Sequence, residues 1–457
     1  MSGRVAPVVY KFGGTSVGDG TRIRHVARLV ADGPRPLVVI VSAMAGVTDV
    51  LQRLVDGADA RARPGPQALL AELRSRHLEA LKTLGPVAAS ERPALEARLD
   101  ALGEVVAGRG DLTGRMREDA ILSAGEDLTQ RIVYAALEAQ GVRAAAVDAR
   151  DVLVTDAQFG GAAPDRARTR AACAAKLDPL LADGRVVVLQ GFVGATPDGH
   201  TTTLGRGGSD FSATILGGAL DAEAVHIWTD VNGVMSGDPR QVDAPHLLPE
   251  IGFEELVELA WAGARVIHPV AAKWAVAEGV PLTIRDSFQP EHEGTRVRHD
   301  VRGAAAIAAI TAKRGVALIK VRSHPVALPY GFLARVFGVL GRHRLEVDLV
   351  ATSHSSTAFT IDDQARLDEV AAELGTFADV EVAKSLVTIT LVGRGLLAEP
   401  GVGGQVFAVV GDTPVHLVSQ ASDVSLSLVV NADDADSLTR RLHAALIAGA
   451  NRSRRSA

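Results

Sequence analysis

Short apolar runs alternate with longer helical patterns from Val5 to about Ser287. The predicted strands are Val8 to Lys11, Leu37 to Val41, Ala144 to Asp148, Val186 to Gln190, Ala224 to Thr229 and Leu282 to Ile284. This alternation predicts an α/β fold with a mostly parallel sheet and helices on both of its faces. The stretch from Val50 to Gly141 lacks strand signals, so we expect a largely helical excursion from the sheet.

The pattern changes after the turn-rich segment Gln289 to Gly294, where a β-α-β-β-α order is predicted twice. The first round has strands at Val316 to Val321, Val347 to Ala351 and Thr357 to Ile361, and helices at Phe332 to His343 and Ala365 to Leu374. The second has strands at Val387 to Val392, Val415 to Val418 and Ser425 to Val430, and helices near Gly404 to Val410 and at Ala435 to Ala448. Two small α+β units after a large α/β domain suggest a catalytic part followed by a paired sensing part.

Composition narrows the possible partners and compartments. With 457 residues and 47% hydrophobic content, the chain is long enough for two to four domains. The net charge of -6 comes from mixed acidic and basic residues, so no basic stripe is available for nucleic acid. The single cysteine, Cys173, cannot form an internal disulfide, so we expect a reduced, buried thiol. With neither a signal peptide nor a membrane-length apolar run, we expect a cytoplasmic protein without membrane contact.

The first candidate site is the segment Lys11 to Ser16, in which a predicted strand ends in Gly13 and Gly14. Backbone amides left uncovered by glycine, with a cation beside them, suit a phosphate group. The segment is not a P-loop, because its glycine spacing and the order of glycine and lysine differ. A simple strand-to-helix turn would explain the same residues.

The second candidate is Thr203 to Asp210, which follows a strand and leads into an apolar helix. Arg206 stands among glycines, where a guanidinium is poorly placed for packing and well placed to hold a carboxylate or phosphate. The alternative is that Ser209 or Asp210 merely caps the helix.

Three further segments have both a functional and a structural interpretation. Thr229 and Asp230 end a strand, where ligands bind in open α/β sheets, although an ordinary Asn-Gly turn follows them. Glu126 could bind a substrate ammonium or complement a helix dipole. Thr48 could contact substrate or cap a helix.

Taken together, the motifs resemble those of the aspartokinases in order and approximate spacing over nearly the whole chain. They are KFGGTSV, VSAMAGVTD, LSAGE, TLGRGGSD, WTDVNGV with GDPR, and GARVIHP. The resemblance implies a three-layer α/β/α amino-acid-kinase domain over residues 1–298, followed by two ferredoxin-like ACT domains. The first ACT domain would span 313–384, and the second would be discontinuous, with 299–312 joined to 385–450. The apolar run Ala306 to Thr311 would be its missing strand, and residues 451–457 would fray.

The resemblance also implies roles for individual residues in phosphorylating the β-carboxylate of L-aspartate with ATP and Mg²⁺. Lys11 and Asp210 would be catalytic, and Thr48, Glu126, Arg206 and Ser209 would bind aspartate. The nucleotide contacts would be Gly13, Gly14, Thr15, Gly207, Gly208, Thr229, Asp230, Met235, Arg240, Arg265 and Val266. No side-chain set is predicted to bind a metal, and Mg²⁺ would be carried mainly by the nucleotide phosphates.

The second half resembles the lysine-sensitive members of the family, which implies L-lysine as effector. The implied effector residues are Gly331, Phe332, Leu333, Val347, Asp348 and Ser353. In the structural alternative, Asp348 is a solvated carboxylate at a strand start. Three residues depart from the family pattern: Arg265 replaces a lysine, Met235 replaces a tyrosine and Pro329 replaces a serine.

Two other functions remain open at this stage. One is an amino-acid kinase acting on a glutamate-type carboxylate, and the other is a sensor whose kinase domain has lost turnover. The paired repeats and the LSAGE segment count against the first, and the charged cluster of Lys11, Arg206 and Asp210 counts against the second. Because ACT units usually sense ligands where two of them pair, we expect a homodimer or a dimer of dimers.

Overall fold

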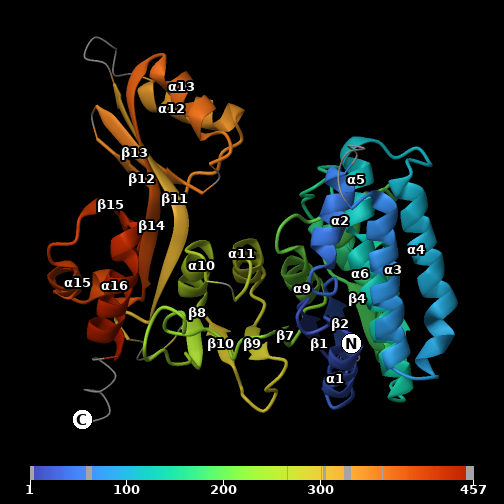
Figure 1. Ribbon diagram of the computed structural model, residues 1–457. Coiled ribbons are helices and arrows are strands. Elements are labelled where there is room, and N and C mark those ends of the chain that lie inside the picture. Colours follow the sequence, from blue (N-terminus) through green and yellow to red (C-terminus); the bar gives the residue numbers. More distant parts are fainter. Residues whose placement is uncertain are drawn as a thin grey trace, which may run out of the picture. The chain divides into compact units, whose positions relative to one another are not determined.

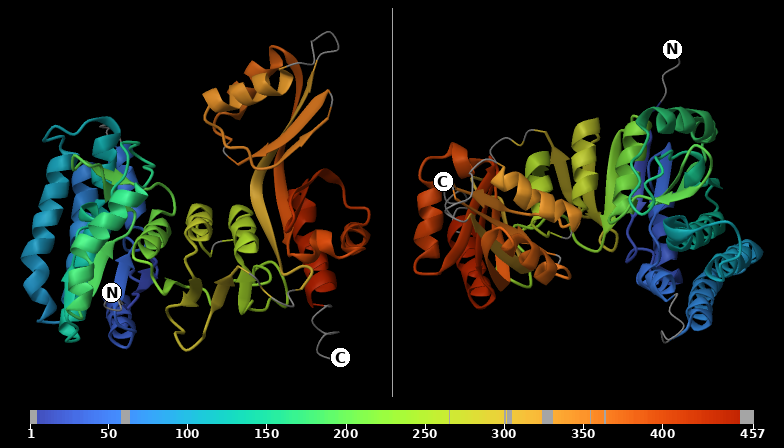
Figure 2. Two further views of the ribbon diagram at one scale, coloured as in Figure 1. Left: turned by 180° about the vertical axis from the view of Figure 1, so that it is seen from behind. Right: turned by 90° about the horizontal axis from the view of Figure 1, so that it is seen from above.

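The computed structural model describes residues 5–57, 64–264, 266–299, 301, 305–323, 331–353, 355–362 and 364–448. The chain divides into two compact units, which are described separately (Figures 1 and 2). The first unit comprises Met1–Val234, Pro249–Phe253 and Arg265–His299, and the second comprises Met235–Leu248, Glu254–Ala264 and Asp300–Ala457. Within the described ranges, none of the helices has the length and apolar character needed to cross a membrane.

An eight-stranded sheet forms the centre of the first unit, in the order β3-β4-β2-β1-β7-β9-β10-β8. Its strands are β1 (Val8–Phe12), β2 (Leu37–Val41), β3 (Ala144–Ala146), β4 (Val186–Gln190), β7 (Ala224–Thr229), β8 (Glu250–Gly252), β9 (Leu282–Asp286) and β10 (Thr295–Arg298). From β3 to β9 all neighbouring strands are parallel, and only the β9–β10 pair is antiparallel. Every residue of β1, β2 and β4 is buried, as expected for parallel strands covered on both faces.

Helices cover both faces of this sheet. Those of the first unit are α1 (Gly20–Ala31), α2 (Val47–Asp56), α3 (Pro66–Thr83), α4 (Arg92–Val106), α5 (Gly114–Leu122), α6 (Ala124–Ala139), α7 (Arg166–Lys176), α8 (Asp178–Ala182), α9 (Gly208–Ala219) and α11 (Pro269–Glu278). One large core joins alternate residues of β1 and β2 to α1, α2, α3, α4 and α6. On the opposite side, α9 packs against β1 and β2 and lies beside α11 (Figure 1). It also packs against α7. The predicted helical excursion between β2 and β3 is confirmed.

The second unit is built on a six-stranded antiparallel sheet, in the order β12-β13-β11-β14-β16-β15. Its strands are β11 (Ala309–Ser323), β12 (Val350–Thr352), β13 (Ser356–Ile361), β14 (Ala378–Val392), β15 (Val415–Ser422) and β16 (Ser425–Asn431). Its helices are α10 (Phe253–Trp261, of which Phe253 belongs to the first unit), α12 (Phe332–Arg342), α13 (Leu367–Gly375), α14 (Gly395–Ala398), α15 (Val402–Val410) and α16 (Ala432–His443), which continues into a π-helical turn (Ala444–Ala448).

The two central strands of this sheet are β11 and β14 (Figure 1). They contribute side chains to two separate hydrophobic cores. Ile319 and Val321 of β11 pack under α12 and α13, whereas Ile310 packs with α15 and α16. The register of β11 against β14 shifts near Gly315, which has a φ of 77°. Each 15-residue strand therefore contributes to both halves of the sheet.

Several element boundaries differ from the predictions. The strand β11 begins at Ala309, inside the predicted run Ala306 to Thr311, and continues through the predicted strand at Val316; its polar middle hides this continuity in the sequence. Likewise, β14 begins at Ala378, well before the predicted Val387. The predicted strand at Val347 begins only at Val350. The short strands β5 (Val193–Ala195), β6 (Thr201–Thr203), β8 and β10 are too brief to leave a clear pattern.

Candidate active site

The loops after β1 and β2 pack closely at the carboxyl edge of the parallel sheet. The Gly13 amide donates to the Trp228 carbonyl of β7 at 3.0 Å, and the Ala45 amide donates to the Gly14 carbonyl at 3.0 Å. A Cβ atom at Gly14 would lie only 2.8 Å from the Ala43 carbonyl oxygen, so this position requires glycine. The Gly13 amide is therefore already engaged within the protein, and the phosphate contacts of Gly13 and Gly14 stay predictions.

Lys11 and Asp210 form an ion pair at this edge of the sheet. The Lys11 Nζ lies 2.6 Å from the Asp210 Oδ1, and the two side chains are 10% and 14% exposed. The His268 amide donates to the other Asp210 oxygen at 3.2 Å. A Cβ atom at Gly13 would lie 3.7 Å from the Lys11 Nζ, so the glycine leaves space beside the ammonium. A cation is thus held next to a glycine loop.

The helix α9 begins with a glycine in the left-handed conformation. Its N-cap is Gly207, with a φ of 68°, and no side chain caps the helix, so the alternative that Ser209 or Asp210 is the cap is wrong. A Cβ atom at Gly207 would lie 2.0 Å from the His268 Cγ. The Gly208 amide donates to the Gly205 carbonyl at 3.0 Å, so it is engaged within the loop. The start of this 12-residue helix nevertheless presents the positive end of its dipole.

Glu126 is buried in the first turn of α6 and is 5% exposed. Burial raises the pKa of Glu126 to about 8, whereas the Ala43 amide and the Lys11 cation act to lower it. The carboxyl group is therefore mostly protonated at neutral pH. A ligand cation beside it would stabilise the ionised form.

An ion-pair network that contacts the start of α6 was not predicted from the sequence. The Arg150 guanidinium donates to both oxygens of Asp127 at 2.9 Å and to the Ser123 Oγ at 3.0 Å. The Gln190 side chain at the end of β4 also donates to Asp127, at 2.9 Å. Burial acts to lower the pKa of Arg150, but its bonds to Asp127 outweigh burial and raise it. The only sequence signal was a second acidic residue, Asp127, beside Glu126 in the first turn of the helix.

Other predicted residues lie nearer the surface of the first unit. Arg206 and Thr48 are exposed, and Thr48 does not cap α2, whose N-cap is Gly46. The Thr229 hydroxyl donates to the exposed Asp230 at 3.2 Å. The remaining residues, Thr15, Ser209 and Val266, are half-buried.

The structure does not bring the predicted nucleotide residues into one unit. Met235 and Arg240 belong to the second unit, where Arg240 pairs with Asp238 at 2.7 Å. Arg265 and Pro329, two of the three departures from the family pattern, lie outside the described residues.

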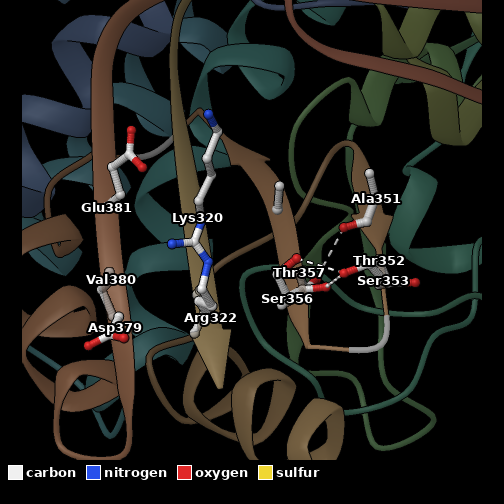
Figure 3. Close-up of a pocket in the computed structure, with 12 residues that line it drawn as sticks. Lys320, Arg322, Ala351, Thr352, Ser353, Ser356, Thr357, Asp379, Val380 and Glu381 are labelled. Atoms are coloured by element: carbon white, nitrogen blue, oxygen red, sulfur yellow. Dashed lines mark hydrogen bonds between the residues drawn. The ribbon is translucent and has the colours of Figure 1, made fainter. Parts of the chain in front are cut away.

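The predicted effector residues are spread over three places in the second unit. Gly331 is the N-cap of α12, with a φ of 83°, and Phe332 and Leu333 open that helix. Val347 and Asp348 line a cavity beside β14. Ser353 lines a different hollow on strands β11 to β14, where its Oγ bonds the Ser356 Oγ at 2.7 Å (Figure 3).

Asp348 already has a cationic partner within the chain. The Lys313 Nζ lies 3.2 Å from the Asp348 carboxylate and also contacts Asp362. Burial raises the pKa of Asp348, and Lys313 opposes that effect. The alternative of a solvated carboxylate at a strand start is therefore wrong, because Asp348 is only 21% exposed and precedes the strand.

Comparison with known proteins identifies the family. The profile of the "Amino acid kinase family" matches residues 6–286, and an "ACT domain" profile matches 389–446. "Lysine-sensitive aspartokinase 3" of Escherichia coli is 34% identical over 448 residues, covering 96% of this chain and 99% of the relative. The chain belongs to the aspartokinase family. The aspartokinase of Chlamydia trachomatis is also similar, with 33% identity over 96% of this chain and 97% of the relative.

Solved aspartokinase structures agree with the fold. Escherichia coli aspartokinase III in complex with aspartate and ADP (R-state) matches with a TM-score of 0.85, covering 96% of this chain and 99% of that one. The same aspartokinase in complex with lysine and aspartate (T-state) matches with a TM-score of 0.82 and 34% identity. The predicted fold class, an amino-acid-kinase sandwich followed by ACT domains, is confirmed.

Proposed function

We propose that this aspartokinase transfers the γ-phosphoryl group of ATP to the β-carboxylate of L-aspartate, forming 4-phospho-L-aspartate. The observation that carries the proposal is the clustering of Lys11, Asp210 and the buried Glu126 at the carboxyl edge of β1 and β2. The relative that was solved with aspartate and ADP supports the choice of both substrates. The reaction would be the first step of lysine biosynthesis and of the related threonine and methionine pathways.

The substrate itself supplies the nucleophile. A lone pair on the β-carboxylate oxygen forms the new bond to the γ-phosphorus, and the bond from phosphorus to the bridging oxygen breaks, leaving its electron pair on ADP. Negative charge spreads over the transferring group, and Lys11 would stabilise it electrostatically. Asp210 would hold the Lys11 ammonium in position through their 2.6 Å contact. Catalysis would then depend on positioning and charge rather than on an enzyme nucleophile.

Aspartate binding would use residues from three segments. Glu126 would receive the substrate ammonium, which favours its ionised form despite burial. Arg206 would hold a carboxylate with two parallel hydrogen bonds. Thr48 and Ser209 would add polar contacts.

The nucleotide would be held by backbone and side-chain donors. In the first unit these are the Gly14 amide, Thr15, the start of α9, Thr229, Asp230 and Val266. We retain Arg265, Met235 and Arg240 as proposed contacts. Among the described residues, no group of three or more acidic, histidine or cysteine side chains could hold a metal ion. Mg²⁺ would be carried mainly by the nucleotide phosphates and would keep water ligands, with Asp210 orienting Lys11 or the metal shell.

The domain limits and the regulation are also proposals. The catalytic domain would span 1–298, with ACT domains at 313–384 and at 299–312 joined to 385–450. The strand β11 contributes residues to two separate hydrophobic cores, which supports a division of this region into two ACT domains. L-lysine would inhibit the enzyme, as the relative solved with lysine suggests. A homodimer or a dimer of dimers, and a cytoplasmic location, stay predictions.

The test is hydroxamate formation from ATP, Mg²⁺ and hydroxylamine with L-aspartate, L-glutamate or acetylglutamate as acceptor. We expect turnover with aspartate alone and a loss of at least about a hundredfold in kcat for Lys11→Met, because the charge on the transferring group loses its stabilisation. Lys82→Met, an exposed lysine in the last turn of α3, is the matched control and should retain activity.

Two results would contradict the proposal. Turnover with a glutamate-type acceptor but not with aspartate would indicate another amino-acid kinase. Effector binding without turnover on any acceptor would indicate a sensing protein.

A further inference from the structure

Asp119 of α5 is a buried carboxylate that the proposed function does not use. Its residue is 0% exposed. Burial raises the pKa of Asp119, and the hydrogen bonds that the carboxylate accepts from Thr203 and Gly160 oppose this rise. Within the described ranges, Asp119 forms no ion pair. A buried carboxylate without a cationic partner destabilises the folded protein unless hydrogen-bond donors surround it, so packing alone does not account for this residue.

Three donors from two other segments bind the Asp119 carboxylate. The Thr203 hydroxyl donates to Oδ1 at 2.7 Å, and the Thr203 amide donates to Oδ2 at 3.0 Å. The Gly160 amide donates to the same Oδ2 at 3.0 Å. Thr203 is the last residue of β6, and Gly160 lies in the loop before α7. The carboxylate thus joins α5 to a strand and a loop that are both far from it in sequence.

These contacts lie beside the loop that carries Arg206. Arg206 follows Thr203 by only three residues. A Cβ atom at Gly205 would lie 3.5 Å from the Gly160 carbonyl oxygen, so this loop lies against the same segment that Asp119 holds. The path of the chain into Arg206 is therefore fixed by the bonds to Asp119.

The helix that carries Asp119 leads directly to Glu126. The Ser123 amide donates to the Asp119 carbonyl at 2.9 Å, and the Asp127 amide donates to the Ser123 carbonyl at 3.2 Å. Hydrogen bonds of the helical kind therefore continue from α5 into α6. Glu126 lies in the first turn of α6, so a shift of α5 also moves Glu126.

A second connection, through Arg150, joins the same elements. The Arg150 Nε donates to the Thr201 hydroxyl at 2.9 Å, and its terminal nitrogens donate to Asp127 at 2.9 Å. The strand β6 is thus linked to α5 and α6 at both of its ends, by Asp119 at Thr203 and through Arg150 at Thr201. Two links at separate points fix both the position and the direction of a short strand.

We propose that Asp119 is a positioning residue for L-aspartate, which sets the distance between the Glu126 carboxylate and the Arg206 guanidinium. The inference rests on the proposed function, in which these two groups receive the ammonium and a carboxylate of the substrate. Both ends of the substrate are held at once, so a change in this distance weakens the binding of aspartate. The effect on ATP is smaller, because most of the proposed nucleotide contacts lie in other segments.

The test is the hydroxamate assay with aspartate and ATP varied in turn, on the wild type and on variants of β6. Thr203→Val removes the hydroxyl that donates to Asp119, and Thr203→Ser keeps it. Thr202→Val is the matched control, because Thr202 is the preceding residue of β6, is also buried, and bonds the Thr155 hydroxyl at 2.7 Å instead.

We expect Thr203→Val to raise the KM for aspartate about tenfold, with a smaller rise in the KM for ATP. Thr203→Ser should recover most of the affinity, and Thr202→Val should keep the KM of the wild type. Asp119→Asn, which replaces one acceptor oxygen by a donor group, should raise the KM for aspartate at least as much as Thr203→Val does.

Thermal unfolding separates positioning from general damage to the fold. Thr203→Val and Thr202→Val should lower the unfolding temperature by similar amounts, because each removes one buried hydroxyl. The inference is overturned if these two variants have the same KM for aspartate, or if Thr203→Val raises the KM for ATP as much as that for aspartate. A wild-type protein without aspartate turnover would instead overturn the proposed function, and the inference with it.

Discussion

At the scale of single residues, burial decides the chemistry of the site. Glu126 and Lys11 have the same charges in the sequence as many surface residues. Their enclosure raises the pKa of Glu126 to about 8 and leaves Lys11 with Asp210 as its close partner. When a charged group is shielded from water, its pKa is set by the nearest charges and hydrogen-bond partners. A bound ligand can therefore shift the pKa of each of these groups strongly.

The raised pKa of Glu126 predicts a pH dependence of substrate binding. If the ammonium of aspartate requires the ionised carboxylate, the KM for aspartate should rise about tenfold for each pH unit below 8, because the carboxyl must first lose its proton. Glu126→Gln should raise the KM and abolish this dependence. Hydroxamate assays between pH 6.5 and 9 measure the KM for aspartate and its change with pH in both proteins. If the KM of the variant changed with pH as steeply as that of the wild type, another group would cause the dependence.

The same group predicts a pH dependence of stability. Its pKa is about 8 when folded against 4.5 when unfolded, so between these values the folded state binds more protons and stability falls as pH rises. Glu126→Gln should therefore stabilise the protein little at pH 5 and by a few kcal/mol, in order of magnitude, at pH 8. Thermal unfolding of both proteins at the two pH values measures the difference. An equal gain at both would show that the carboxyl is not titrating.

At the scale of elements, the start of α9 is defined by a close approach rather than by a cap. Gly207 lies against His268, whose own amide holds Asp210. The contact joins the loop before α9 to the segment before α11, so the position of the Lys11–Asp210 pair depends on it. No side-chain cap could serve this geometry, because a Cβ at the N-cap would overlap the imidazole.

Gly207→Ala is expected to destabilise the protein and lower kcat. Gly199→Ala is the matched control, because Gly199 also has a positive φ, of 89°, but has no atom within 4 Å of its would-be Cβ. The control should cost about 1–2 kcal/mol from backbone strain alone. Gly207→Ala should cost at least about 2 kcal/mol more from overpacking, as measured by denaturant unfolding. Equal costs would mean that His268 moves aside freely.

At the scale of the whole molecule, regulation requires coupling between the effector residues and the catalytic residues. Linkage makes this coupling reciprocal for binding. If L-lysine weakens the binding of aspartate and ADP by some factor, these ligands must weaken lysine binding by the same factor. Titration of lysine with and without aspartate and ADP checks this, and unequal factors would indicate that lysine acts on turnover instead.

Asp348→Asn should weaken lysine inhibition at least tenfold while basal turnover is unchanged, because an amide cannot pair with the effector ammonium as a carboxylate does. Asp362→Asn is the control, since it removes the other partner of Lys313 but not the proposed effector carboxylate. Inhibition curves for L-lysine on the three proteins measure the effect. If lysine inhibition weakened equally in both variants, the cause would be the altered pairing of Lys313 and not the loss of the Asp348 carboxylate.

The sequence by itself determined the family, the fold class and most of the central strands. Three of those strands, at Leu37 to Val41, Val186 to Gln190 and Ala224 to Thr229, have the predicted bounds, because buried parallel strands are continuous apolar runs. Glycine and charge at strand ends pointed to Lys11, and the family motifs pointed to Asp210, since a phosphate site needs such groups locally.

Only the tertiary structure decided how these residues are engaged. The Gly13 amide donates to the Trp228 carbonyl, and Arg150 donates to Asp127, and no local pattern records a partner that is far away in sequence. The length of β11 was hidden because its polar middle is stabilised by pairing with β14 rather than by its own apolar character. The Lys313–Asp348 pair and the hydrogen bonds of the buried Asp119 carboxylate likewise exist only because folding brings separate segments together, where burial sets the energy of each polar group.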